Sequence, residues 1–89
     1  MNRLSRDERR IFALLITRGT DEGWAGRDSA ENDALVQLVP AAQMARPLKQ
    51  KEADLAAGMA KKALDVDSTT RRLHRREIKS IYDKMKTPN

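Results

Sequence analysis

The chain contains no cysteine among its 89 residues. This absence excludes a disulfide framework, a thiolate zinc site and a cysteine nucleophile. The single histidine, His74, falls on the apolar side of a predicted helix, where a packed and hydrogen-bonded side chain is favoured over a metal ligand or a base. Asp21 and Glu22 lack the ligand spacing of a calcium loop. The sequence therefore predicts no enzyme, no metal site and no cofactor.

Aromatic residues are also scarce, since Phe12, Trp24 and Tyr82 are the three in the sequence. Hydrophobic residues make up 39% of the chain. A domain of this length buries only about 60% of the surface that its unfolded chain exposes. We therefore expect one domain, spanning residues 1–89, with a thin core of aliphatic and alanine side chains. Such a core leaves room for added stability from a homodimer.

No hydrophobic run is long enough to cross a bilayer. The apolar stretch from Ile11 to Ile16 is far shorter than the roughly 20 residues that a membrane-spanning helix needs. It follows Asp7 and Glu8, which are not typical of a secretory signal. The sequence thus predicts a core helix here, no membrane partner and a cytoplasmic location.

Charge is plentiful and unevenly distributed, with a formal net charge of +5. Negative charge is concentrated in residues 19–34, which contain five acidic residues and one cation, Arg27. Residues 64–89 carry four arginines and three lysines against four acids. This segregation predicts basic helices beside an acidic loop, which either neutralises them or screens them from other partners.

Helical spacing and capping residues define four predicted helices, and no segment has the alternation typical of a strand. Ser5 and Glu8 form a capping box, which starts a helix that Gly19 should end. Residues 19–28 are predicted to form a loop. A second helix, capped near Asp28, should end before Pro40, because Val39 is pushed toward extended geometry.

A third helix is predicted with Pro47 in its first turn and an alanine-lined face, and it should pack on the first or the fourth helix. A turn over 65–68 follows, and Asp67 or Ser68 should cap the fourth helix. Residues 86–89 are predicted to be a frayed tail. The fold class is therefore all-α, as a small bundle of about four helices with a helix-turn-helix-like C-terminal pair.

The fourth predicted helix carries the most informative pattern. At 100° per residue, Ile78, Ile81 and Met85 lie on one face and the cations lie on the other. In a helix-turn-helix protein, the N-terminal part of such a helix enters the major groove, and arginine can grip guanine or phosphate with two bonds. The turn lacks the glycine that is often found there. The predicted nucleic-acid-binding residues are Thr69, Arg71, Arg72, Arg75, Arg76 and Lys79.

These patterns favour a small non-enzymatic DNA-binding protein, such as a dimeric transcription regulator. The alternative is a small inhibitor or adaptor that docks on an acidic or nucleic-acid-handling protein. RNA binding is less favoured, because it usually requires exposed aromatic side chains. A solvated cationic helix face without a partner also fits the pattern. Trp24 either seals the core or anchors a protein partner, since tryptophan is enriched at interface hot spots.

Overall fold

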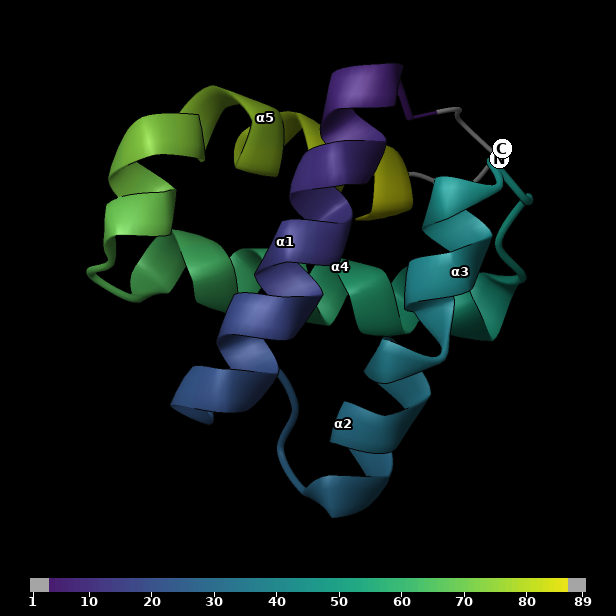
Figure 1. The fold of residues 1–89 in the computed structure, drawn as a ribbon, viewed down its shortest axis with the longest axis horizontal. Coiled ribbons are helices and arrows are strands. Elements are labelled where there is room, and N and C mark those ends of the chain that lie inside the picture. The colour runs from purple at the N-terminus through teal and green to yellow at the C-terminus, as the bar shows by residue number, and fades with distance from the viewer. Residues whose placement is uncertain (1–3, 87–89) are drawn as a thin grey trace.

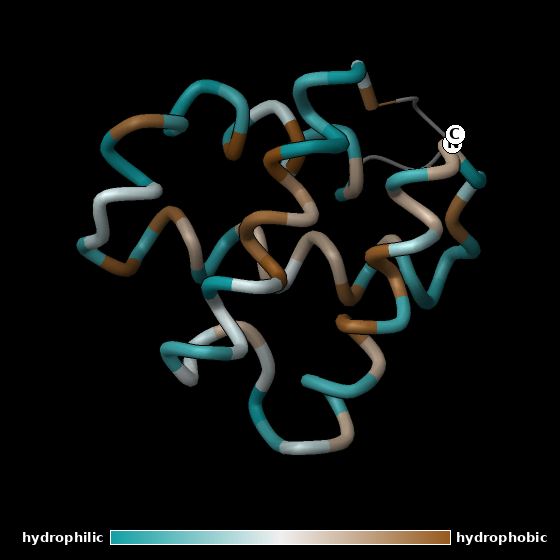
Figure 2. Tube along the Cα trace, in the orientation of Figure 1, coloured by the Kyte–Doolittle hydropathy of each residue, from teal (hydrophilic) through white to brown (hydrophobic). Residues whose placement is uncertain are grey.

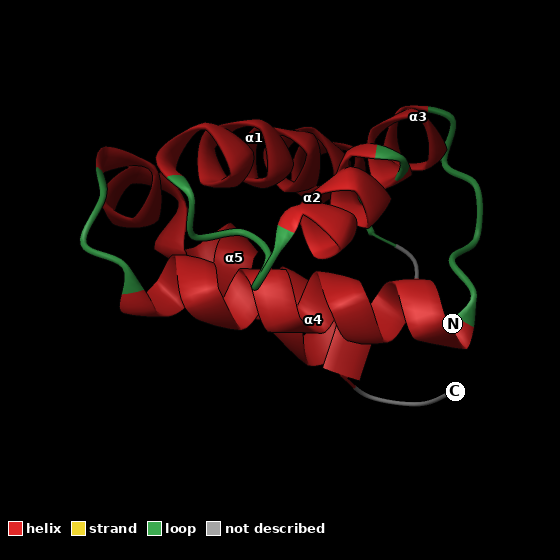
Figure 3. Ribbon diagram, turned by 90° about the horizontal axis from the view of Figure 1, so that it is seen from below, coloured by secondary structure: helices red, strands yellow, loops and turns green. Residues whose placement is uncertain are grey.

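A computed structural model describes residues 4–86, and five α-helices and no strand account for its regular structure (Figure 1). The expected all-α bundle is confirmed, with one short helix, Leu38–Gln43, that was not predicted as a separate element. The helices are α1 (Arg6–Glu22), α2 (Ser29–Val36), α3 (Leu38–Gln43), α4 (Gln50–Asp65) and α5 (Thr69–Lys86). Figure 3 shows α1, α2 and α3 lying over α4.

The predicted capping box starts α1. The Ser5 hydroxyl accepts the backbone N–H of Glu8 at 3.1 Å, and the Glu8 carboxylate accepts the backbone N–H of Ser5 at 2.7 Å. The predicted end at Gly19 is wrong, because α1 continues to Glu22 and Gly23 caps it at φ 83°. The loop therefore spans 23–28 rather than 19–28.

Gly19 serves close packing instead of helix termination. A Cβ at this position would lie 2.6 Å from the Cβ of Ala25 and 3.0 Å from the Trp24 ring. Trp24 and Ala25 also donate their backbone N–H groups to the carbonyl of Gly19, at 3.0 and 3.1 Å. The chain after α1 thus folds back over this glycine.

Substituting two other glycines by alanine should change stability in opposite directions. Gly23→Ala is expected to cost about 1 kcal/mol, because a side chain disfavours its left-handed backbone. Gly58→Ala should stabilise by roughly 0.5–1 kcal/mol, because this exposed α4 residue has open space around it and gains helix propensity. Urea unfolding of both variants measures the two signs, and the same sign for both would contradict this account.

Pro40 lies inside a helix, and its predicted role as a terminator is wrong. Asp28 caps α2 as expected, with its carboxylate accepting the backbone N–H of Glu31 at 2.9 Å. The helix ends at Val36, Gln37 forms a turn, and α3 begins at Leu38. Pro40 then occupies the first turn of α3, where a missing N–H removes no intrahelical bond. The chain that follows Pro40, which the sequence analysis placed outside its predicted helices, is therefore helical up to Gln43.

The predicted start of the third helix at Pro47 is also wrong, because α4 begins at Gln50. The N–H of Lys49 donates to the Glu52 carboxylate at 2.9 Å, which secures the first turn. The alanine-lined face is buried as predicted, and α4 packs chiefly on α5. Its buried residues are Ala53, Ala56, Ala57, Met59, Ala60 and Ala63.

The core lies where α1 crosses α4 and α5. Figure 2 shows hydrophobic segments gathered in this interior and hydrophilic ones around the outside. Phe12, Leu15, Ile16, Ile78 and Ile81 are fully buried. Lys86 is the last residue of α5, so the first residue of the predicted tail is helical, and residues 87–89 lie outside the described residues.

A polar contact joins the first turn of α1 to the C-terminal half of α5. The carboxylate of Glu8, whose side chain is only 9% exposed, accepts hydrogen bonds from the Lys84 ammonium at 2.6 Å and from the Ser80 hydroxyl. Burial raises the pKa of Glu8, but the hydrogen bonds from Lys84, the Ser5 backbone and Ser80 outweigh it and hold the pKa at about 2. This contact fixes α5 against α1.

Candidate nucleic-acid interface

α5 carries the six predicted nucleic-acid-binding residues, and Ser68 caps it. The Ser68 hydroxyl accepts the backbone N–H of Arg71 at 3.1 Å, which confirms one of the two expected caps. Beyond the first turns, Ile78, Ile81 and Met85 are buried, as the spacing predicted. The opposite side of α5 therefore faces solvent.

The backbone of α5 is broken at His74, which the sequence did not predict. His74 has φ −128° and ψ 25°, outside the helical region, so the residues before and after it belong to two helical pieces. Its side chain lies half-buried in a groove beside α1 and has no hydrogen-bond partner within residues 4–86. The sequence predicted that His74 would be packed and hydrogen-bonded. The predicted hydrogen bond is wrong, because the kink leaves the imidazole ring in this open groove.

Before the kink, the predicted binding residues are held by Asp67. The Asp67 carboxylate accepts Arg71 Nη2 at 3.2 Å and Arg72 Nη1 at 2.7 Å. Arg71 also donates to the backbone carbonyl of Leu64 at 3.3 Å, and its side chain is only 25% exposed. Arg72 is 59% exposed and donates to the hydroxyl of Thr69 at 3.3 Å. One carboxylate therefore offsets part of the charge of both guanidinium groups.

After the kink, exposed cations lie along one side of α5, and we call three of them, Arg75, Arg76 and Lys79, the outer cations. Among the residues that the structure describes, Arg75 and Arg76 have no ion-pair or hydrogen-bond partner. Lys79 lies 3.3 Å from Asp83, and its side chain is 63% exposed. Exposure of this kind leaves the pair weak and open to exchange for another anion. The outer cations are thus the accessible part of the predicted site.

The structure does not confirm α4 and α5 as a helix-turn-helix. The first turns of α5 lie beside α1, and the two helices form the walls of a groove of about 560 Å³. The residues Leu14, Arg18 and Glu22 line it from α1, and the segment 67–70 with Arg72, Leu73 and His74 lines it from the other side. In a helix-turn-helix protein, the first turns of the second helix enter the major groove. Here α1 lies beside the corresponding turns of α5.

Two leucines and one arginine of this groove were missed by the sequence analysis. Leu73 is 70% exposed although it is large and apolar, Leu14 is half-buried, and Arg18 stands next to them. Leu73 belongs to neither the apolar nor the cationic face of the predicted helix. This position was the one sequence feature that could have indicated an exposed leucine. Single exposed apolar side chains are common on protein surfaces, so it is the position of Leu73 at the edge of a groove that suggests a contact with a partner.

Trp24 lies half-buried against the core. Its indole N–H donates to the Glu22 carboxylate at 2.8 Å, and its ring packs near Gly19. Elsewhere in the acidic segment, Arg27 pairs with Glu31 at 2.7 Å, and this arginine lowers the pKa of the Glu31 carboxyl. Part of the acidic charge is therefore neutralised within the segment itself.

Within residues 4–86, no three histidine or carboxylate side chains come together in a way that could hold a metal ion. Nor is any helix of that region both long enough and apolar enough to cross a membrane. Comparisons with protein-family models, with curated proteins and with solved structures found no match to this chain.

Proposed function

We propose that this protein binds duplex DNA by gripping its phosphate backbone with the outer cations of α5. The observation that carries this proposal is the adjacent pair Arg75 and Arg76, both exposed and without an intramolecular partner in the described part of the chain. Arginine bonds phosphate oxygens in a bidentate fashion and stays charged at any physiological pH. The net charge of +5 adds long-range attraction to a polyanion.

The binding mode that we propose is contact with phosphates rather than reading of base edges. Asp67 offsets the charge of Arg71 and Arg72, so these residues would need to leave an ion pair before they could contact a base. α1 stands beside the first turns of α5. Phosphate contacts give affinity and orientation without sequence information. We therefore expect weak sequence preference.

A salt titration tests this function. Binding of fluorescent duplex DNA should weaken steeply with salt, with a slope of log affinity on log salt of roughly −3 if three phosphates are contacted. Single-stranded DNA and RNA of the same length serve as comparisons, and size-exclusion mass gives the oligomeric state. Absent or salt-insensitive binding to every duplex would overturn the proposal.

A second candidate function, docking on a larger protein as an inhibitor or adaptor, is favoured by the exposed Leu73 and its groove. An apolar anchor with Arg18 and Arg72 at the same groove suits a partner surface that combines an apolar contact with acidic groups. In that case a stable one-to-one complex with such a protein would survive nuclease treatment. Leu73→Ser would weaken it and leave duplex affinity unchanged.

A further inference from the structure

The turn between α4 and α5 holds one acidic side chain that two arginines share. A single carboxylate oxygen of Asp67, Oδ1, accepts Arg72 Nη1 at 2.7 Å and Arg71 Nη2 at 3.2 Å. Arg72 Nη2 also donates to the hydroxyl of Thr69 at 3.3 Å. Two guanidinium groups thus converge on one anionic oxygen, and this is the arrangement of an anion-binding site.

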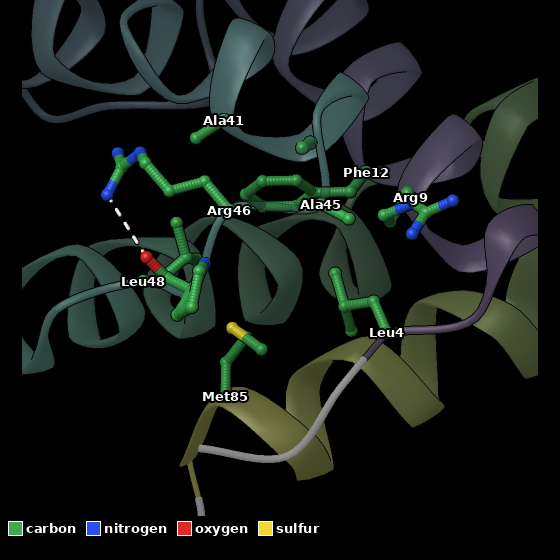
Figure 4. Close-up of a pocket in the computed structure, with 10 residues that line it drawn as sticks. Leu4, Arg9, Phe12, Ala41, Ala45, Arg46, Leu48 and Met85 are labelled. Carbon is green, nitrogen blue, oxygen red and sulfur yellow. Dashed lines mark hydrogen bonds between the residues drawn. The ribbon is translucent and has the colours of Figure 1, made fainter.

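The ion pair with Asp67 leaves Arg72 only partly bonded. Arginine binds a carboxylate or a phosphate best when two of its N–H groups each reach a separate oxygen. Arg46, in the connection between α3 and α4, has this complete arrangement, since its Nη1 and Nη2 bond the two oxygens of Glu52 at 3.2 and 2.9 Å. Arg46 also donates to the carbonyl of Pro47 at 3.0 Å, the bond drawn in Figure 4. Arg72 receives one bond from one oxygen of Asp67, so its pair is the more easily exchanged of the two.

The shared carboxylate opens onto the groove between α1 and the first turns of α5. Asp67 and Arg72 both line this groove, and their side chains are 75% and 59% exposed. An ion pair this exposed contributes little to stability, so separating it costs little. Arg18 lines the opposite wall and has no ion-pair or hydrogen-bond partner in the described part of the chain, while Glu22 on the same wall is bonded to the Trp24 indole. An anion that enters the groove therefore meets a guanidinium group on each wall.

We propose that Asp67 competes with DNA for Arg72: its carboxylate occupies an anion site that a backbone phosphate takes once Asp67 is displaced. Arg72 precedes Arg75 and Arg76 by three and four residues, so this site lies next to the outer cations along α5. The two unesterified oxygens of a phosphodiester supply the second bond that Asp67 leaves unmade. Asp67 thereby lowers the affinity for DNA and keeps the contact reversible. This inference rests on the proposed DNA contact, whose outer cations do not include Arg72.

Asp67→Asn tests the competition, because it keeps the shape of the side chain and removes its charge, and Ser68 still caps α5. The affinity for duplex DNA should rise by about tenfold at constant salt, and the slope of log affinity on log salt should steepen from roughly −3 to roughly −4. Asp65→Asn is the matched control, because Asp65 is exposed and has no ion-pair or hydrogen-bond partner among residues 4–86. It should gain less than about threefold, from net charge alone, with an unchanged slope.

A second substitution locates the gain at one arginine. Arg72→Gln in the Asp67→Asn background should return the duplex affinity and the salt slope to about those of the parent protein. Arg9→Gln in the same background removes an equal charge beside Met85, near the other end of α5, and should leave most of the gain in place. Circular dichroism and urea unfolding of each variant show that the fold is retained.

Inorganic phosphate tests the anion site without DNA. In Asp67→Asn it should shift the Arg72 Nε–H resonance saturably, and in the parent protein the same shift should need about tenfold more phosphate. The proposal is overturned if Asp67→Asn and Asp65→Asn tighten duplex binding equally, or if phosphate leaves the Arg72 resonance unmoved. Equal tightening of poly-glutamate binding would assign the site to carboxylates of a protein partner instead. If no variant binds duplex DNA, the proposed function fails, and the phosphate titration alone decides the anion site.

Discussion

Replacing Arg75 and Arg76 together by alanine is expected to lower the affinity for duplex DNA by about thirty- to a hundredfold at constant salt. Each guanidinium contributes a charge-assisted contact to phosphate, and losing both costs about 2–3 kcal/mol. The slope of log affinity on log salt should become shallower by about 2. Both side chains are exposed, so thermal unfolding of the variant should match that of the parent protein.

The matched control removes the same charge elsewhere. Lys51 and Lys61 are exposed on α4, and their double alanine variant has the same net charge as the arginine variant. It should lose only the small affinity that depends on net charge. Equal losses in the two variants would mean that DNA responds to the overall charge, and the local contact at α5 would have to be abandoned.

Glu8→Gln is expected to give the largest change in stability, a loss of about 2–3 kcal/mol or roughly 10 °C or more in Tm. The substitution keeps an oxygen that can accept the Ser5 N–H but removes the charge that faces Lys84 in a mostly buried position. It thereby weakens the contact that joins α1 to α5. Asp7→Asn is the control, because Asp7 is exposed and lies in the same helical turn. Its ion pair with Arg10 is long, at 3.8 Å, and therefore weak. The cost of Asp7→Asn should stay below about 0.5 kcal/mol.

The same carboxylate should make stability depend on pH in acid. The pKa of Glu8 falls from 4.5 to about 2 on folding, because Lys84, Ser5 and Ser80 stabilise its charged form against the opposing effect of burial. A lowered pKa stabilises the fold fully above 4.5, and this contribution disappears as pH falls toward 2. Urea unfolding across that range should show a decline of up to about 3 kcal/mol in the parent protein that is missing in Glu8→Gln. Parallel curves would show that other carboxylates cause the acid response.

Structural features that depend on residues close together in the chain could be predicted from the sequence. The capping box of Ser5 and Glu8, the Asp28 cap and the Ser68 cap each depend on residues three positions apart, which helical geometry brings together. The alanine-lined face of α4 followed from periodicity alone. These local rules were enough to establish an all-α bundle.

Glycine and proline were misinterpreted because tertiary contacts decide their roles. Gly19 and Gly23 were both available to end α1, and the packing of Trp24 and Ala25 over Gly19 determined which one did. Pro40 is compatible with both the end of a helix and the first turn of one. Only the position of the Gln37 turn distinguishes the two.

For the candidate site, the exposure of the cations could be predicted from the sequence, whereas their ion pairs were not predicted. Spacing placed Arg75, Arg76 and Lys79 on the solvent side of α5, as the structure has them. Asp67 and Arg71 are four residues apart, so their ion pair was accessible to sequence reasoning and was missed. The kink at His74 was not predicted, because no proline or glycine lies at that position. The groove between α1 and the first turns of α5 is formed by segments distant in the chain, which no local pattern brings together.

The contact between Glu8 and Lys84 spans almost the whole chain, and it has a consequence for synthesis on the ribosome. During synthesis α1 emerges before α5, so it finds its partner Lys84 and the buried side chains of Ile78 and Ile81 only after α5 has left the ribosome. Until then Phe12 and Leu15 lack part of their cover, so the nascent chain remains incompletely folded and open to chaperones. The core of this bundle is therefore completed only once α5 is available, rather than helix by helix.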